Sequence, residues 1–284
     1  MLLWSTGFVG AKYGLPYAEP FTFLALRLSI ASGLLGVAAA LTRTSMRRAQ
    51  VGRAAVSGLL LHATYLGGVF FAISRGTPAG VSAVIVSLQP VLVAALATRL
   101  LGEQLVRRQW LGLALGVAGV ALVIAPGLAA RTGDLPVAGV VACLVALVGG
   151  TTGTLWQKRH GDGIPLLWGT CVQYAAAAAV LLGLSATTES MRIDWTPKFV
   201  GALLWLVFVL SIGAVLLLLV LLRRGSAAGV SSLFYLVPPA TAVESFLVFG
   251  ERLAALSVGG IVIAAVGVAL VVRPVNADVG IPDA

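Results

Sequence analysis

Glu244 is the side chain of this sequence with the clearest capacity for chemistry. It lies six residues after Pro238 and seven before Glu251, inside a long apolar stretch. If that stretch crosses a membrane, inserting an ionisable group there costs roughly 2.5 to 3.5 kcal/mol, so the group should face a cavity and have a function. Glu244 is therefore a candidate to bind a cationic group of a solute, or to take up a proton, because burial favours the neutral carboxyl group. The structural alternative is a carboxylate satisfied by a neighbouring hydroxyl group or arginine.

Further polar and amphipathic side chains interrupt the apolar runs. His62 and Tyr65 are three residues apart and so share one face of a helix. Each such residue alone is more often a hydrogen bond between helices than a ligand contact, but together they fit a mostly apolar pocket whose few polar groups fix orientation. Gln173 and Tyr174 are secondary candidates. With Glu244, the predicted substrate-binding residues are Trp4, His62, Tyr65, Gln89, Trp156, Gln157 and Tyr235.

Several other kinds of site are not indicated. His62 and His160 are the only histidines, so we expect no metal site. The sequence has no Gly-Lys-Ser/Thr phosphate loop, so neither ATP hydrolysis nor any cofactor is expected. The net charge of +9 comes without a basic stripe interleaved with aromatic residues, which argues against nucleic acid. Cys143 and Cys171 lie in apolar runs and are interpreted as packing residues.

The elements that must hold these side chains are membrane-spanning helices. Of the 284 residues, 59% are hydrophobic and 10% are charged, whereas water-soluble domains carry about 25% charged residues. A bilayer core takes about 20 apolar residues per helix. The sequence therefore predicts an all-α polytopic membrane protein with ten spans. These are Met1–Leu15, Pro20–Leu41, Ala54–Ile73, Pro78–Leu101, Gln109–Ala125, Pro136–Gln157, Pro165–Ala186, Phe199–Leu222, Ser226–Phe249 and Ala254–Val272.

Basic residues between the spans predict the orientation. The strongest cluster lies between residues 43 and 53, and loops rich in Lys and Arg stay in the cytoplasm. With ten spans, both termini are then cytoplasmic, including a mobile tail over 274–284. The first span is short and lacks a charged leader, so we expect further residues to precede Met1. Twelve of the nineteen basic residues fall on the cytoplasmic side: Arg43, Arg47, Arg48, Arg53, Arg99, Arg107, Arg108, Lys158, Arg159, Arg223, Arg224 and Arg273.

The sequence contains the same unit twice. A shift of 148 positions places Pro90 on Pro238, Gly102-Glu103 on Gly250-Glu251, and residues 119–123 on the identical 267–271. Weaker matches extend this towards the N-terminus, at offsets of 149 and then 146. We predict a first repeat over 1–126 and a second over 136–273. Five spans per repeat is an odd number, so the second repeat must be inverted in the membrane, the arrangement typical of secondary transporters.

These motifs also carry a family resemblance. The segment Trp-Ser-Thr-Gly-Phe from Trp4, followed by Pro20, Arg27 and the doubled proline-to-Gly-Glu pattern, resembles the drug/metabolite transporter superfamily in its ten-helix EamA-type branch. The resemblance implies a central cavity lined by the first, third and fourth helices of each repeat, with the fifth and tenth helices packed at one side. It also implies solutes such as amino acids, metabolites or drugs, without saying which.

Glycines and prolines within the predicted spans are candidates for structural roles in helix packing and helix bending. The glycines at helical spacing in spans five and ten predict a close helix contact, because small residues let membrane helices approach. Prolines inside spans four and nine predict kinks that serve either as a hinge for gating or as static bends. The packing glycines are Gly112, Gly116, Gly119, Gly260 and Gly267, and the prolines are Pro90, Pro238 and Pro239.

Three charged residues near span ends remain open to more than one interpretation. Glu103 and Glu251 each follow a glycine and are expected to cap helices or to pair with Arg107 and Arg252. Arg27 has three alternatives: its side chain extends to the membrane surface, pairs with an acid such as Glu19, or contacts substrate.

The sequence thus predicts a secondary active transporter, with export favoured, for small organic solutes in the cytoplasmic membrane. It would work by alternating access, with the solute and the lipid bilayer as its partners. Substrate, coupling ion and the choice between monomer and homodimer stay open. The alternative is an integral-membrane enzyme acting on lipid-linked substrates, which would need two clustered acids or a His/acid pair near one surface. A sensor or assembly subunit would need a sizeable soluble domain, which the sequence lacks.

The role of Glu244 is testable by a substitution that keeps its shape. We expect Glu244→Gln to weaken transport or to remove its pH dependence while leaving folding intact, because only the charge and the proton site are lost. Solute uptake into proteoliposomes across a pH series measures this. Transport by the variant that matches the wild type at every pH would remove Glu244 from the site.

Overall fold

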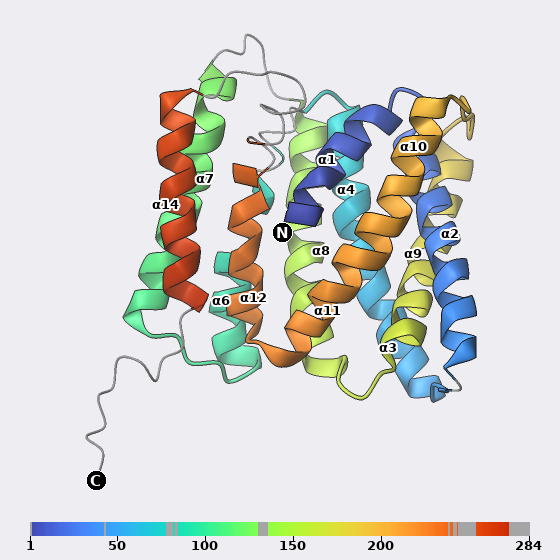
Figure 1. Ribbon diagram of the computed structural model, residues 1–284, viewed down its shortest axis with the longest axis horizontal. Helices are drawn as coiled ribbons and strands as arrows, with labels where there is room; N and C mark the ends of the chain where they lie inside the picture. Colours follow the sequence, from blue (N-terminus) through green and yellow to red (C-terminus); the bar gives the residue numbers. More distant parts are fainter. Residues whose placement is uncertain are drawn as a thin grey trace.

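The computed structural model describes residues 2–42, 44–77, 82, 85–129, 136–237, 239–240, 243 and 254–272. These residues form a helical bundle (Figure 1). The described helices of the first half are α1 (Leu2–Gly14), α2 (Pro20–Leu41), α3 (Arg48–Gly58), η1 (Leu59–Thr64), α4 (Tyr65–Ser74), α6 (Gln89–Leu100) and α7 (Arg107–Ala129). Those of the second half are α8 (Val137–His160), α9 (Leu166–Thr188), α10 (Pro197–Trp205), η2 (Leu206–Ala214), α11 (Val215–Arg224), α12 (Ala227–Ser232), η3 (Leu233–Leu236) and α14 (Ala255–Val272).

The described helices fit a protein that crosses a membrane several times. Among the residues that the structure describes, six continuous helical stretches are long and apolar enough to span a bilayer: Pro20–Leu41, Arg48–Ser74, Val137–His160, Leu166–Thr188, Pro197–Arg224 and Ala255–Val272. The 13 residues of α1 rise about 1.5 Å each, which is less than the roughly 30 Å of a hydrocarbon core. The total of ten crossings remains a prediction.

Two long helices contain a wider turn at matching places. In the stretch from Arg48 to Ser74, η1 is a π-helical segment, and η2 is its counterpart in the stretch from Pro197 to Arg224. The Thr64 hydroxyl group donates a hydrogen bond of 2.9 Å to the Leu59 carbonyl oxygen, five residues earlier. π-Helical turns are uncommon and occur frequently at functional sites.

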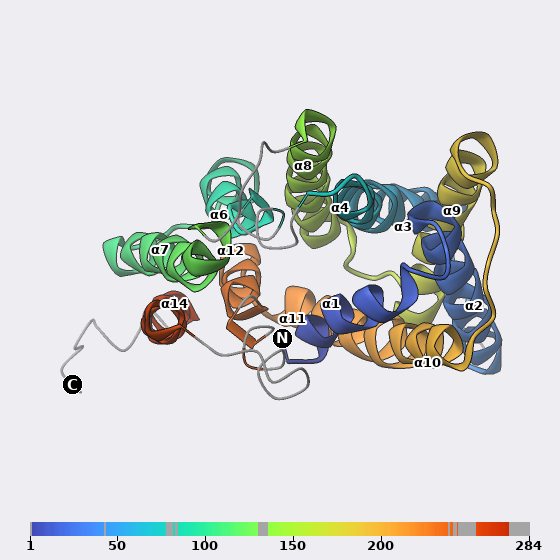
Figure 2. The ribbon, with the colours of Figure 1, turned by 90° about the horizontal axis from the view of Figure 1, so that it is seen from above.

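Pairs of antiparallel helices form opposite ends of the bundle (Figure 2). At one end α2 packs on α9, and hydrogen bonds join Thr22 to Ser185 (2.6 Å) and Ser32 to the Cys171 carbonyl oxygen (2.9 Å). At the other end α7 packs on α14. Later residues of one helix meet earlier residues of the other in both pairs, which makes each pair antiparallel.

The contact between α7 and α14 is made largely by glycine backbones. A Cβ atom added to Gly267 would lie 2.6 Å from the Gly112 carbonyl oxygen, and one added to Gly260 would lie 2.6 Å from that of Gly119. Two hydrogen bonds flank the glycines, from Gln109 Nε2 to the Val271 carbonyl oxygen (3.2 Å) and from Ser257 Oγ to that of Val123 (2.9 Å). The predicted packing glycines therefore lie along this contact. Gly116 contributes backbone atoms to it, whereas a Cβ atom at Gly116 would point at Tyr235.

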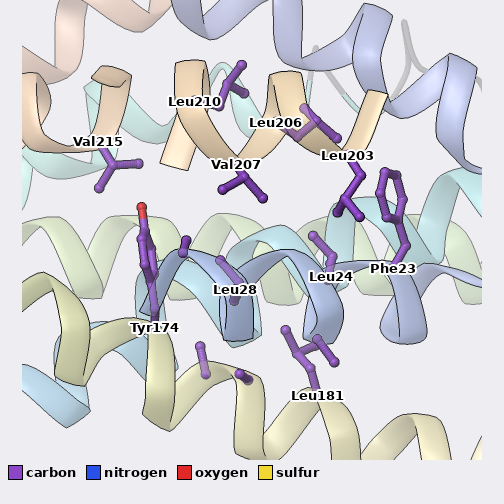
Figure 3. Close-up of a cluster of buried hydrophobic side chains, with 14 of the residues drawn as sticks. Phe23, Leu24, Leu28, Tyr174, Leu181, Leu203, Leu206, Val207, Leu210 and Val215 are labelled. Atoms are coloured by element: carbon purple, nitrogen blue, oxygen red, sulfur yellow. The ribbon is translucent and has the colours of Figure 1, made fainter. Parts of the chain in front are cut away.

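A hydrophobic cluster fills the space between α2, α9 and the α10–η2 segment (Figure 3). Phe23, Leu28, Leu181 and Leu206 are fully buried in it. Their apolar contacts join helices that are far apart in the sequence and so hold the two halves together. Tyr174 also belongs to the cluster and brings a hydroxyl group to its edge.

Carboxylates cap helix N-termini across the bundle. Glu189 accepts hydrogen bonds from the backbone N–H groups of Phe21 and Thr22 at 2.7 Å, which satisfies the first turn of α2. The Glu19 carboxylate accepts from the Ser190 hydroxyl and N–H groups, and these bonds hold the pKa of Glu19 below its usual range. Glu19 therefore bonds to Ser190 and not, as one alternative held, to Arg27.

Glu103 has the capping role that was one of its two predicted alternatives. Its carboxylate accepts hydrogen bonds from the N–H groups of Ala227 (2.6 Å) and Ala228 (3.3 Å) at the start of α12. A negative charge is favourable at a helix N-terminus. Glu251, its counterpart in the second half, lies outside the described residues.

The basic segments between helices lie together on one of the two faces of the bundle at which the helices begin and end. Gln50 Nε2 donates to the Gly163 carbonyl oxygen at 2.9 Å, and Lys158 Nζ donates to the carbonyl oxygens of Leu222 (2.9 Å) and Gly225 (2.6 Å). These bonds join the chain segments that follow α2, α8 and α11. The opposite face holds the loops that carry Glu19 and Glu189.

The glycine contact gives a stability prediction with a control on the same helix. We expect Gly267→Ala to lower the free energy of unfolding by about 1 to 3 kcal/mol, because the new methyl group meets backbone atoms of α7 that cannot rotate away. A Cβ atom at Gly259 of α14 meets nothing within 4 Å. Gly259→Ala should therefore be neutral or raise stability by up to about 1 kcal/mol. Unfolding of both variants in mixed detergent measures this, and equal effects would contradict it.

Candidate functional site

Two adjoining cavities lie at the centre of the bundle. The first is lined by Trp4, Arg27, Tyr65 and apolar residues of α4 and η2. The second is lined by His62, Gln89 and Thr154 with apolar residues of α11 and η3. Trp4, Tyr65 and Val215 line both cavities, which are therefore neighbours.

Four of the predicted substrate-binding residues line these cavities: Trp4, His62, Tyr65 and Gln89. They come from α1, η1, α4 and α6, and helices of the second half complete the walls. The Gln89 side chain is fixed by bonds from Nε2 to the Gly150 carbonyl oxygen (3.3 Å) and to Thr154 Oγ1 (3.2 Å) of α8. Trp4 makes an edge-to-face contact with Phe234 of η3, with ring centroids 5.3 Å apart.

Three of the other predicted residues lie elsewhere. Trp156 donates its indole N–H to the Arg53 carbonyl oxygen (3.0 Å), and its ring contacts the tilted ring of His160, with centroids 4.0 Å apart, near the basic end of α8. Tyr235 is fully buried against Gly116 of α7. Gln157 is buried next to the cavities but is engaged by side chains of neighbouring helices. Glu244 and Pro238 lie outside the described residues.

Pro90 of span four and Pro239 of span nine both occupy helical positions. Pro90 is the second residue of α6, so it starts a helix and does not bend a continuous one. The first turn of a helix has no backbone acceptor for the missing N–H group, which is why proline fits there. Pro239 has helical backbone conformation, and its side chain is buried. A gating role for Pro90 and Pro239 remains a prediction.

A chain of buried polar side chains runs beside the cavities. Gln157 Oε1 accepts hydrogen bonds from Ser57 Oγ (2.7 Å) and Gln173 Nε2 (3.2 Å), and Gln173 Oε1 lies 3.3 Å from His62 Nε2. The His62 ring contacts the Tyr174 ring edge to face, with centroids 4.8 Å apart. In hydrocarbon such groups must find partners within the protein, and here they find them on other helices.

Arg27 continues this chain on the far side of Tyr174. Its Nε donates to Ser211 Oγ at 2.8 Å, and the Tyr174 hydroxyl group donates to the Ser211 carbonyl oxygen. Arg27 is only 4% exposed, which excludes the alternative in which its side chain extends to the membrane surface. Sequence reasoning left the role of Arg27 open and overlooked Ser211.

The repeat relates these two polar pairs to each other. Arg27 and Gln173 are 146 positions apart, and His62 and Ser211 are 149 apart. The eight buried positions of α9, shifted back by 146, all fall on buried positions of α2, which supports the first offset. The pair Arg27–Ser211 therefore corresponds to the pair Gln173–His62. This correspondence is the signal in the sequence that identifies Ser211.

The arrangement offers a mostly apolar cavity with a few hydrogen-bonding groups and one fixed positive charge. The residues that line it, as far as the structure describes them, include no acidic side chain. Among the described residues no group of three or more His, Cys, Asp or Glu side chains is placed to hold a metal ion. The site is suited to holding an organic solute by shape, by hydrogen bonds and by charge.

Comparison with known proteins places the whole chain in one group. Residues 1–125 and 137–273 both match the family described as "EamA-like transporter family". The chain is 31% identical over 274 residues to "Uncharacterized transporter YvbV" of Bacillus subtilis, covering 95% of this chain and 88% of that protein. It is 25% identical over 278 residues to "Probable amino-acid metabolite efflux pump" of Salmonella typhimurium, covering 94% and 90%. One solved crystal structure has the same fold, with a TM-score of 0.79 at 20% identity over 95% of this chain and 92% of that one.

The bond between Arg27 and Ser211 yields a prediction about stability. We expect Ser211→Ala to lower the free energy of unfolding by about 1 to 3 kcal/mol, because a buried guanidinium group loses its acceptor. Ser29→Ala, at an exposed position of α2, is the control and should change stability little. The double variant with Arg27→Gln should be less destabilised than the sum of the single variants. Strict additivity would show that the two side chains do not interact.

Proposed function

Because the chain belongs to the EamA-like transporter family, we propose that it is a secondary active transporter of small organic solutes that works by alternating access. The observation that carries this proposal is the antiparallel pairing of corresponding helices. α2 and α9 correspond in the repeat and lie antiparallel, and so do α7 and α14. Two similar halves of opposite orientation can exchange conformations, which opens a central site to each side in turn.

The glycine contact supports inverted repeats in detail. Gly112 and Gly260 are equivalent by the offset of 148, as are Gly119 and Gly267. Gly112 meets Gly267 and Gly119 meets Gly260, so exchanging the halves exchanges the two contacts. The flanking bonds from Gln109 to Val271 and from Ser257 to Val123 exchange in the same way. A contact that maps onto itself on exchange is what a two-fold axis relating the two halves of one chain would produce.

The orientation and boundaries follow from this scheme. The repeats would cover 1–126 and 136–273, and the loops joined through Gln50, Lys158 and Leu222 would be cytoplasmic because they carry the basic residues. Both termini would then be cytoplasmic in a protein of the cytoplasmic membrane.

Direction and coupling are further parts of the proposal. The name of the Salmonella relative favours export and solutes related to amino acids. Glu244 is the proposed coupling site for protons, and the segments around Pro90 and Pro238-Pro239 are the proposed gates. Solute flux into liposomes that contain only this protein separates this proposal from the alternative of an enzyme acting on lipid-linked substrates.

Alternating access predicts labelling from both sides of the membrane. In a background with Cys143 and Cys171 replaced by alanine, Tyr65→Cys should react with a membrane-impermeant maleimide added to either side, because Tyr65 lines both central cavities. Val145→Cys, on the exposed face of α8, should react from neither side. Saturating transported solute should change the ratio of the two rates. Labelling of Tyr65→Cys from one side only, under every condition, would contradict the mechanism.

A further inference from the structure

We propose that Arg27 binds the carboxylate of the transported solute, so that the substrates are organic anions or zwitterions with a carboxylate and an apolar body. This inference rests on the proposed transport function, because it assigns a substrate class to the same central site. It starts from the position of a single charged side chain.

A buried cation in a membrane protein needs a partner. Within the described residues, Arg27 is the charged side chain that lines the first cavity, and its guanidinium group has one hydrogen bond, from Nε to Ser211 Oγ. Arginine carries five N–H donors in a planar fork that matches a carboxylate in two parallel bonds. Ser211 accepts from Nε and so orients the group. The remaining donors are available to a ligand in the cavity that Arg27 lines.

The rest of the cavity defines the body of that ligand. Trp4 and Tyr65 provide aromatic surface with one polar tip each, while Val69, Phe70 and Leu210 are wholly apolar. A solute held by one carboxylate at Arg27 would place a hydrophobic group against these side chains. Aromatic or branched aliphatic amino acids and monocarboxylates have this shape and charge.

The repeat provides an internal comparison for Arg27. The equivalent position in the second half is Gln173, a neutral amide that hydrogen-bonds His62 and Gln157 within the protein. A side chain of that size and polarity is thus accommodated in a matching environment without a charge. The charge at position 27 is therefore not required by the helix packing that the two halves share.

The test is ligand-dependent thermal stability of the purified full-length protein. The probes are L-phenylalanine and 3-phenylpropanoate, each compared with the corresponding amide, which has the same body and no carboxylate. A bound ligand raises the melting temperature by mass action. We expect the carboxylates to stabilise the wild type and the amides to fail. The Kd of the carboxylates should rise by about 10- to 100-fold in Arg27→Gln, the loss typical of a hydrogen bond to a charged group.

Two control variants test whether the loss of binding is specific to the charge of Arg27. Arg99→Gln removes an exposed arginine at the end of α6 and should bind the carboxylates like the wild type. Arg27→Lys keeps the charge and should retain part of the affinity. If Arg27→Gln does not fold, as judged by gel filtration without ligand, Arg27→Lys with a several-fold loss against the wild type decides the question.

Several outcomes would overturn the inference. One is equal stabilisation of Arg27→Gln and the wild type by the carboxylates, and another is stabilisation of the wild type by the amides to the same degree. A third is flux of neutral or cationic solutes in proteoliposomes with no carboxylate bound or carried, which overturns the substrate class but leaves the proposed function intact. Carboxylate binding that depends on Arg27 without flux of any solute would support the site and contradict transport.

Discussion

The need to satisfy polar groups inside a hydrocarbon environment governs the centre of this protein. A buried polar side chain there has no water to bond, so a hydrogen bond to the protein or to a ligand stabilises it. Several of the described bonds of this kind cross from one half of the chain to the other, whereas the Gln173–Gln157 and Tyr174–Ser211 bonds lie within the second half. Arg27 bonds Ser211, His62 bonds Gln173, and Ser57 bonds Gln157. The interface between the halves therefore contains polar contacts beside the mostly apolar cavities.

The contact between α7 and α14 follows a different rule. Between α7 and α14 the contact is made by glycine backbones at the closest approach that helices allow, and neighbouring apolar side chains surround it. Contacts of this kind depend on shape and have few alternative arrangements, since interiors are close-packed. Beside the cavities, by contrast, hydroxyl and amide groups make hydrogen bonds between helices. In the proposed mechanism, the α7–α14 contact would stay fixed while the polar contacts beside the cavities rearrange.

The features that the sequence predicts are those whose residue types and spacing have few alternative explanations. The helices, the repeat and the glycine contact follow from periodicity and offset alone, because small residues at helical spacing have few other uses in a membrane helix. Trp4, His62, Tyr65 and Gln89 were identified as polar groups in apolar runs, and that same signal selected Trp156, which instead lies near a helix end. Composition gives no depth along a helix, so interfacial and central residues look alike.

Arg27 and Ser211 show a second limit of sequence reasoning. An arginine near the start of a span has several acceptable environments, and only its neighbours decide between them. A serine in a leucine-rich helix has no signal of its own, because one hydroxyl group is readily satisfied by the backbone. Superposing the repeats would have related both residues to the pair Gln173 and His62, so the missing information lay in the comparison of the two halves.

The differences between the halves matter as much as their likeness. A chain with two identical inverted halves would have inward-facing and outward-facing states of equal energy, and bound solute would meet the same groups from either side. Here a guanidinium group in one half stands where an amide stands in the other, and a serine where the other half has a histidine. In the proposed mechanism, such substitutions would make the two states unequal in energy and in their contacts with a charged solute. A protein can be shifted between states only as far as its ligand prefers one of them. In the proposed mechanism, Arg27, which has no acidic partner among the described residues, would give a solute of opposite charge such a preference.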